Sequence, residues 1–506
     1  MTSVPSHRQP SSGNNALRYG LLALLLTTAV SSCELFRPVD TTGPTTGSRP
    51  DRGDEDLDAV QSRRVFDEET GTYVYITVPT QPMDTVEWEA VSETDNPPIT
   101  DDTSYAFTPG ANAGPAAPGL PPVRQLGTGR NGSRLLSGYG VDFVLPFLTD
   151  RNDEDGRSID PNSLWALHFY SGAELALEDI EEENGDISYD VRVQDTRANP
   201  RQVETILQSP EYQRSQLIIG PYLKDNVSLL ADAANGQEKV VISPYSAATG
   251  ISEGNVNYVQ VNPTLETHLR ELLGHAFRTQ GADRIVLVVP KGQQARLAYF
   301  QDEYRLLTGD DQVAPLQELV IGEEVPALDT LLDGDRTVFM VPVYDNETFV
   351  SNFLRQVYQS TVEQRGANVA VYGLPQWADF ERLNPEFLEN TNVHISSSVF
   401  IDPLDPDVQR FRRRFFDRFA TLPRNEAYIG YDVARYFLKM AARYGTRFQF
   451  ELENNPEDLI HTSFRFAPVA VIPADADSVE EAVIDRFENR FVNILKYTDY
   501  AFKRVN

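Results

Sequence analysis

Cysteine is the scarcest residue in this chain. Cys33 is the only one among 506 residues. One thiol can form no disulfide within the chain, so a protein of this length must hold its fold together with an apolar core. A single cysteine also excludes the CxxC pairs from which zinc sites with thiolate ligands are built.

Basic residues are few relative to acidic ones. The chain has 44 Lys and Arg against 75 Asp and Glu, which gives a formal net charge of −31. The negative field of such a chain repels nucleic acid and anionic lipid surfaces. We therefore expect no nucleic-acid partner.

Catalytic motifs are missing as well. The six histidines form no HExxH pair, and neither a GxSxG elbow nor a GxxxxGK[ST] loop occurs. Residues 127–132 (GTGRNG) match GxGxxG, but a proline-rich segment precedes them and a strand pattern follows, whereas a dinucleotide fingerprint follows a strand and opens a helix. We expect no enzymatic activity, no cofactor and no metal site.

The N-terminus carries a targeting pattern. Residues 19–30 (YGLLALLLTTAV) are mostly apolar, and Ser31, Ser32 and Cys33 follow them. Roughly 20 residues are needed to cross a membrane, so this run fits the core of a signal peptide instead. The end of the run resembles a bacterial lipobox. That resemblance implies a signal peptide over residues 1–32 and a lipid on Cys33 that anchors the protein in the cell envelope, facing the periplasm or the exterior. The alternative is an ordinary secretory signal that contains a cysteine.

Residues 33–135 have the composition of a tether. Between Glu34 and Asp102 there are 17 acidic and 5 basic residues, and residues 109–129 are rich in Pro, Gly and Ala. Segments of this kind bury too little apolar surface to offset their ordering entropy, so most of this region is expected to be disordered. The alternation in residues 73–78 (YVYITV) favours a strand there, and residues 83–91 leave a second short strand open.

From Tyr139 onward, strand patterns alternate with helix patterns. Such a series predicts parallel sheets covered by helices on both faces. The series restarts near Leu265, which indicates two α/β lobes of similar size. The predicted fold is thus α/β, with two Rossmann-like lobes and a central cleft. Residues 136–506 form this domain: lobe 1 comprises about 136–262 and part of 400–506, and lobe 2 comprises about 265–400 and the rest.

Six local strings, in this order, resemble one family: the type I periplasmic-binding fold, in the branch of branched-chain amino-acid receptors and their lipoprotein relatives. The strings are residues 144–147 (VLPF), 219–221 (IGP), 242–247 (ISPYSA), 261–264 (VNPT), 372–377 (YGLPQW) and 428–433 (YIGYDV). The resemblance covers about residues 139–506. It implies a ligand-binding cleft between the lobes, formed by loops at the carboxyl ends of the strands.

The resemblance also indicates which residues would contact a ligand. In the family, loops after the third and fourth strands hold a carboxylate, and an acid of the second lobe holds an ammonium group. The corresponding positions in this chain, which would face one another across the cleft, are Tyr222, Lys224, Tyr245, Ser246, Ala247, Tyr344, Asp345 and Trp377. Lys224 stands near the usual carboxylate-binding serine, and Ser246-Ala247 replaces the usual Ala-Thr, so an ordinary α-amino acid fits poorly. Two interpretations of Lys224 remain open: it holds an acidic ligand, or it is a solvated loop residue.

Two functions follow from these observations. The first is a membrane-anchored lipoprotein that captures a small polar molecule, amino-acid-like or other, for uptake through an ABC permease or for sensing. The second is an interaction lipoprotein without a ligand, resembling the activators of peptidoglycan synthases, whose partner is a cell-envelope enzyme. The two-lobe architecture favours the first function, whereas the long acidic tether and the altered ligand positions favour the second.

Overall fold

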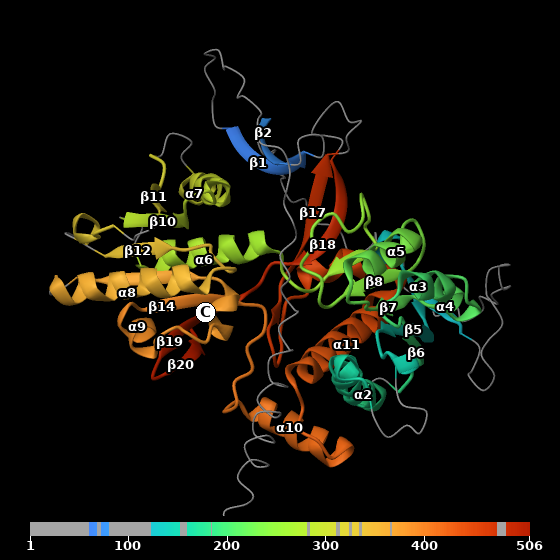
Figure 1. Ribbon diagram of the computed structural model, residues 1–506. Coiled ribbons are helices and arrows are strands. Elements are labelled where there is room, and N and C mark those ends of the chain that lie inside the picture. Colours follow the sequence, from blue (N-terminus) through green and yellow to red (C-terminus); the bar gives the residue numbers. More distant parts are fainter. Residues whose placement is uncertain are drawn as a thin grey trace, which may run out of the picture. The chain divides into compact units, whose positions relative to one another are not determined.

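Two mainly parallel sheets, each with its own helices, make up the folded part of the chain (Figure 1). The computed structural model describes the backbone of residues 60–67 and 72–79, and residues 123–151, 159–183, 185–280, 284–309, 314–322, 326–332, 336–364, 367–472 and 482–506. Cys33, the segment before it and residues 83–91 lie outside the described residues. The architecture confirms the predicted α/β fold class with two Rossmann-like lobes.

The sheet of lobe 1 has the strand order β2-β1-β17-β18-β9-β8-β7-β5-β6, and its neighbours from β6 to β18 are parallel. Every residue of β5 is buried, which fits a strand covered on both faces. Apart from the N-terminal β1 and β2, which are described below, the strands of this sheet are β5 (Gly138–Leu145), β6 (Ser188–Asp195), β7 (Leu217–Ile219), β8 (Val240–Ser243), β9 (Tyr258–Gln260), β17 (Phe466–Ile472) and β18 (Val483–Asn489).

Helices cover both faces of this sheet. Val144 of β5 packs with α3 and α5 in one apolar cluster, whereas its neighbour Phe143 contacts Tyr170 of α2, with ring centroids 5.3 Å apart. Successive side chains of a strand point to opposite faces, so α2 lies on the face away from α3 and α5. The helices of lobe 1 are α2 (Leu164–Glu183), α3 (Pro200–Leu207), α4 (Pro210–Arg214), α5 (Lys224–Ala234), α10 (Pro406–Phe419) and α11 (Asn425–Tyr444).

Two glycines allow α2 and α11 to pack with their backbones in contact. A Cβ atom on Gly172 would collide with the backbone of Ala427, and one on Gly430 would collide with the carbonyl of Phe169. Helices that approach this closely require residues without side chains at the crossing point. The start of α11 is thereby fixed against the part of α2 that carries Trp165 and Phe169.

Lobe 2 has the strand order β11-β10-β12-β13-β14-β19-β20, parallel from β11 to β14 and antiparallel beyond. Apolar clusters fill both faces, one with α8 and the other with α6 and α7. Its elements are α6 (Leu265–Gln280), β10 (Ile285–Pro290), α7 (Ala298–Thr308), β11 (Gln317–Ile321), β12 (Thr337–Met340), α8 (Glu347–Glu363), β13 (Val369–Gly373), α9 (Pro385–Asn390), β14 (Val393–Ser397), β19 (Asn493–Thr498) and β20 (Ala501–Arg504).

Two N-terminal strands extend the sheet of lobe 1. β1 (Val60–Asp67) pairs with β2 (Thr72–Pro79) in antiparallel fashion and with β17 in parallel fashion. β2 includes the alternating residues 73–78, and both strands lie within the segment assigned to the tether. Residues 127–132 lie at the turn of a separate hairpin, β3 (Gln125–Thr128) and β4 (Arg134–Leu136), a setting unlike that of a dinucleotide fingerprint.

The remaining short elements are η2 (Arg130–Gly132), η3 (Thr149–Arg151), η4 (Pro161–Ser163), η6 (Gln294–Leu297), η7 (Asp329–Leu331), η8 (Pro375–Asp379), η9 (Gly445–Asn454), β15 (Glu457–Asp458) and β16 (Ser463–Phe464). Among the residues that the structure describes, no helix is both long and apolar enough to cross a membrane.

A buried carboxylate lies where the chain passes between the lobes. Glu488 of β18, which is fully buried, accepts hydrogen bonds from the hydroxyls of Thr264 (2.8 Å) and Thr267 (2.7 Å) at the start of α6. It also pairs with Arg486 at 2.9 Å and with Arg490 at 3.4 Å. Burial alone would raise the pKa of Glu488, but Arg490, Arg486 and the two hydroxyls lower it to about 2. Glu488 is therefore ionised at neutral pH and holds two crossing segments together.

Candidate functional site

Four aromatic rings gather at the carboxyl ends of the lobe 1 strands. Tyr222 follows β7, Tyr245 follows β8, and Trp165 and Phe169 lie in the first turns of α2, which comes after β5. The ring centroids of Trp165 lie 5.1 Å from Tyr222 and 4.9 Å from Tyr245, and those of Phe169 and Tyr245 are 5.6 Å apart. We call these four residues the aromatic cluster. Tyr245 meets the rings of Trp165 and Tyr222 edge-on, and the other two ring contacts are tilted, as is common for interacting aromatic side chains.

The hydroxyl of Tyr245 is the unusual group of this cluster. Tyr245 is only 4% exposed, and its hydroxyl has no hydrogen-bond partner among the described residues. Burial, with a smaller contribution from the carboxylate of Glu426, raises the pKa of Tyr245 well above its ordinary value, so the phenol is neutral. A buried hydroxyl without a partner costs free energy, and such groups in folded proteins ask for an explanation. Its position at the carboxyl end of a parallel sheet makes it a candidate contact for a ligand.

Charged groups border the cluster where α11 begins. The guanidinium of Arg424 lies 3.6 Å from the carboxylate of Glu426. The backbone N–H of Arg424 donates a hydrogen bond to Nδ1 of His168 at 3.4 Å. Burial, followed by the positive charge of Arg424, lowers the pKa of His168, and Glu426 opposes this only in part. His168 is thus a neutral acceptor at neutral pH. The apolar rings therefore have a polar border that includes charges of both signs.

The other predicted residues of lobe 1 flank this cluster. Ser246 is buried, and its hydroxyl accepts a hydrogen bond from the backbone N–H of Ala248 at 3.4 Å. Ala247, next to it, is half-buried. Lys224 is exposed as the first residue of α5. A positive charge at a helix N-terminus is electrostatically unfavourable, so α5 itself gives no reason for a lysine there.

The predicted residues of lobe 2 contact their own lobe. Arg296 pairs with the carboxylate of Asp345 at 2.9 Å, and its guanidinium lies 4.6 Å from the ring centroid of Tyr344. Trp377 is 1% exposed, donates its indole N–H to the carbonyl of Val343 at 2.7 Å and lies against Gly373. The ring of Trp377 therefore packs in the core of lobe 2. Arg296 was not predicted as the partner of Asp345.

The structure thus brings together Tyr222 and Tyr245, whose ring centroids are 6.3 Å apart, within a cluster that also contains Trp165 and Phe169. Sequence reasoning missed Trp165. The chain has three tryptophans, and one at the start of the helix that follows the first strand of a Rossmann-like lobe could have been recognised as a candidate from its position alone.

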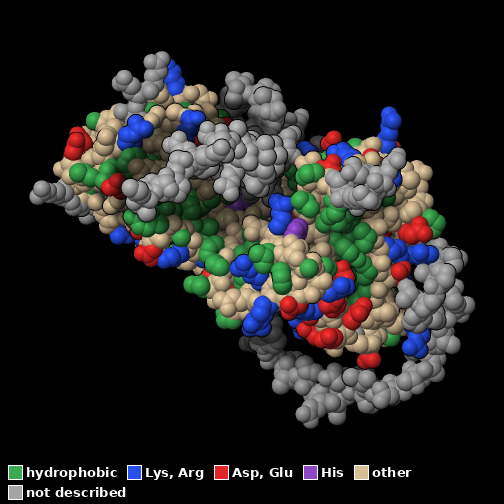
Figure 2. Space-filling view, turned by 60° about the horizontal axis from the view of Figure 1, so that its bottom comes forward, with side chains coloured by type: hydrophobic (Ala, Val, Ile, Leu, Met, Phe, Trp, Pro, Cys, Tyr) green, Lys and Arg blue, Asp and Glu red, His purple; other side chains and the backbone are tan. Residues whose placement is uncertain are grey.

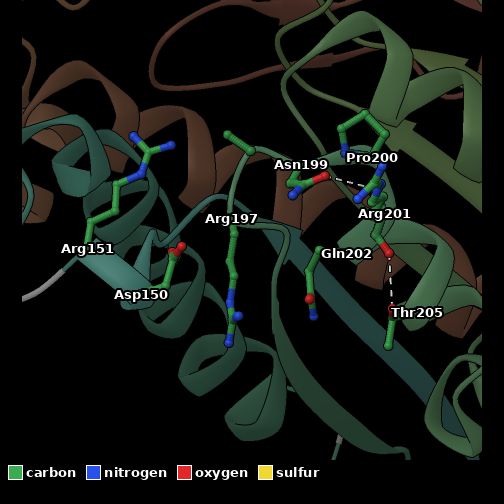
Figure 3. A pocket seen from close by; sticks show the side chains of 9 residues that line it. Asp150, Arg151, Arg197, Asn199, Pro200, Arg201, Gln202 and Thr205 are labelled. Atoms are coloured by element: carbon green, nitrogen blue, oxygen red, sulfur yellow. Dashed lines mark hydrogen bonds between the residues drawn. The ribbon is translucent and has the colours of Figure 1, made fainter.

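A separate hollow of about 460 Å³ opens at the ends of β5 and β6. Asp150, Arg151, Arg197 and Arg201 contribute the charges of its lining. Figure 3 shows Arg151 and Arg197 extending in different directions, so the guanidinium groups do not converge on one anion. Arg197 and Ala198 have left-handed backbone conformations (φ 49° and 51°), supported by Asp195, which accepts a hydrogen bond from the N–H of Arg197. The hollow is an open surface feature with solvated side chains.

Metal ligation finds no support in the ranges given above: no group of three or more His, Cys, Asp or Glu side chains there could hold an ion. The aromatic cluster and its border offer ring faces and hydrogen-bonding groups, which are the usual components of small-molecule sites.

Comparisons with known proteins give similarity to solved structures alone. No protein-family model matches the chain, and no curated protein matches it. The chain is similar to an ABC transporter substrate-binding protein from Desulfitobacterium hafniense, solved with leucine, with 16% identity over 73% of this chain and 100% of that one and a TM-score of 0.43.

Two further solved structures have comparable similarity. A branched-chain amino acid ABC transporter periplasmic ligand-binding protein from Burkholderia xenovorans has 13% identity over 73% of this chain and 94% of that one, with a TM-score of 0.45. Full-length LpoA from Haemophilus influenzae has 15% identity over 72% of this chain and 58% of that one, also with a TM-score of 0.45. At TM-scores below 0.5, no ligand or partner is transferred from these proteins to this chain.

Proposed function

We propose that this protein is a membrane-anchored binding lipoprotein that captures a small polar molecule at the aromatic cluster of lobe 1, for uptake through an ABC permease or for sensing. The observation that carries the proposal is the buried hydroxyl of Tyr245, which has no partner among the described residues and lies among Trp165, Phe169 and Tyr222. Small-molecule sites combine an aromatic wall with a few placed polar groups. Ser246, Lys224 and Asp345 are the further residues that we propose for the ligand.

Substituting Tyr245 separates a binding role of the hydroxyl from a structural one. Tyr245→Phe removes the buried hydroxyl and keeps the ring. Because the hydroxyl has no protein partner, the melting temperature of the ligand-free protein should stay the same or rise. If a ligand accepts or donates a hydrogen bond there, its affinity should fall by about tenfold. The measurement is a thermal-shift screen with amino acids, polyols, nucleosides and peptidoglycan fragments, followed by calorimetry with any compound that stabilises the wild type.

The matched control is Tyr212→Phe. Tyr212 is also buried with a hydroxyl that has no described partner, but it belongs to the apolar cluster of α3 and α5. This variant should respond to the ligand as the wild type does. Trp165→Ala removes a half-buried ring of the cluster and should abolish the stabilisation of the protein by the ligand. That stabilisation reaches about 2.7 kcal/mol when a ligand is present at a hundredfold excess over its Kd. The proposal fails if no compound stabilises the wild type, or if Trp165→Ala still responds.

The anchor is tested by substitution of the single cysteine. Cys33→Ala should leave the protein without a lipid and shift it from the membrane fraction to the soluble fraction, because alanine has no thiol to accept the diacylglyceryl group. Ser31→Ala, which keeps a small residue before Cys33, should remain in the membrane fraction. Metabolic labelling with a radioactive fatty acid gives the readout, and a labelled Cys33→Ala protein would contradict the lipoprotein assignment.

A second candidate function is that of an interaction lipoprotein whose partner is a cell-envelope enzyme. The observation that favours it is the state of lobe 2, where Asp345 is paired with Arg296 and Trp377 is packed in the core. In this alternative the aromatic cluster is structural, and Tyr245→Phe affects no ligand. The same screen therefore distinguishes the two functions.

A further inference from the structure

Helix α10 attaches to lobe 1 through one face. Val408, Phe411 and Phe415 are buried in a cluster with Leu175 of α2 and Tyr428 of α11. Three of the helix's arginines have acidic partners: Arg410 pairs with Asp407, Arg414 with Glu178 and Asp179, and Arg418 with Glu174 at 2.8 Å. The inner face of α10 is therefore buried against the rest of lobe 1, and the charged side chains on its flanks are paired within the chain.

The outer face of α10 is different. Gln409, Arg412, Arg413, Phe416 and Asp417 lie at helical spacing and line a hollow of about 340 Å³ together with Leu422. Phe416 is 51% exposed and Leu422 is 52% exposed. Neither Arg412 nor Arg413 has an ion pair with an acid in the described part of the chain. Figure 2, which turns forward the side of the molecule where α10 lies in Figure 1, shows hydrophobic side chains among both basic and acidic ones.

The outer face of α10 combines exposed apolar and basic side chains. Arg412 and Arg413 lie beside the exposed Phe416, and the one acid of the lining, Asp417, forms no ion pair with either of them in the described part of the chain. Arginine and aromatic residues are enriched where proteins bind one another, and they carry much of the binding energy there. A guanidinium also holds a carboxylate through two parallel hydrogen bonds, which gives the contact direction as well as strength.

We propose that the outer face of α10 binds a segment of a partner protein in which a carboxylate lies next to a large apolar side chain. The apolar side chain fills the hollow between Phe416 and Leu422, and the carboxylate pairs with Arg412 and Arg413. Charge complementarity selects this occupant, because the two guanidinium groups outweigh the single carboxylate of Asp417 and leave the lining with a net positive charge. A lipid bilayer fits less well: a hollow suits a projecting side chain, and the acidic protein is repelled by anionic headgroups.

The test begins with selection of peptides from a random phage-displayed library on the full-length protein. We expect the selected peptides to have Asp or Glu next to Leu, Phe or Trp. Synthetic versions should bind the double variant Arg412→Glu/Arg413→Glu at least about tenfold more weakly than the wild type, and Phe416→Ala should also weaken binding. Affinity should fall as NaCl is raised, since the paired charges are exposed to solvent.

The control is Arg197→Glu/Arg201→Glu, which reverses two other exposed arginines beside an open hollow and should leave peptide binding unchanged. Equal melting temperatures of all variants ensure that the fold is intact. The inference is overturned if selected peptides lack acids, if none is selected, or if Arg412→Glu/Arg413→Glu binds them as the wild type does. It is also overturned if the variant loses binding to vesicles of phosphatidylglycerol and phosphatidylcholine and to no peptide. None of these outcomes depends on whether a small molecule binds the aromatic cluster.

Discussion

Gly430→Ala should destabilise lobe 1 by about 3 kcal/mol, near the upper end of what added volume costs in a packed interior. The new methyl group would lie far inside van der Waals distance of the carbonyl of Phe169. Because the obstacle is backbone and not a flexible side chain, α11 and α2 must separate to accept it. Gly172→Ala should have a similar effect through Ala427. Urea unfolding followed by circular dichroism measures the change.

Gly322→Ala provides the control for these glycine variants. No atom lies within 4 Å of a Cβ placed at Gly322, and its backbone is not in the left-handed region. Its unfolding midpoint should be within error of the wild type. The separation of α2 from α11 also moves Trp165 and Phe169. Gly430→Ala should therefore lower the affinity for any ligand whose affinity Tyr245→Phe lowers. An unchanged midpoint for Gly430→Ala would mean that the helices are not in backbone contact.

Lowering the pH from 7 to 5 should destabilise the protein through two buried histidines. Burial lowers the pKa of His268 and that of His394 to about 4 each, although Glu488 partly opposes this at His268, as does a hydrogen bond to the carbonyl of Asn392 at His394. In the unfolded chain both titrate near 6.5. Between these values the unfolded state binds more protons, so stability falls as the pH falls from about 6.5 towards 4. Each histidine contributes up to about 3 kcal/mol to this loss by pH 4.

Unfolding measured at several pH values tests this. His394→Gln should flatten the dependence of the free energy of unfolding on pH between 7 and 5, even if it lowers the free energy itself. Glu488, with a folded pKa of about 2, acts in the same direction but only below its ordinary value of about 4.5, and so does not interfere in this window. His275, whose ring lies 5.7 Å from that of His394, has a pKa lowered by burial and by Arg278 and adds to the effect. A slope that is the same in the wild type and His394→Gln would refute the assignment.

The alternation of strands and helices could be predicted because buried parallel strands are nearly continuous apolar runs, as in β7 and β8. β18 escaped prediction for the opposite reason. Its residues Asp485, Arg486 and Glu488 are buried with their charges paired to one another, and Glu488 also accepts a hydrogen bond from Thr267 of α6, so the strand has the sequence of a loop. Only the three-dimensional arrangement supplies the partners that make such burial tolerable.

The candidate site was predictable in part. Family strings located Tyr222 and Tyr245 correctly at the ends of neighbouring strands, because strand order fixes which loops meet. Trp377 could not be placed, because whether a ring after a strand turns outward or inward depends on local packing. In this case Gly373 leaves room for the indole, and the carbonyl of Val343 accepts its N–H.

The carboxylate of Glu488 has a mechanical consequence for any motion between the lobes. It joins the segment that enters α6 to the segment that leads from β18 to β19, through Thr264 and Thr267 on one side and Arg490 on the other. Separating these two segments would remove the partners of the ionised Glu488 carboxylate in a protein interior that screens charge poorly. The two connections joined by Glu488 must therefore move together when the lobes rotate. The longer connection, between β14 and α10, then has to accommodate any difference in path length.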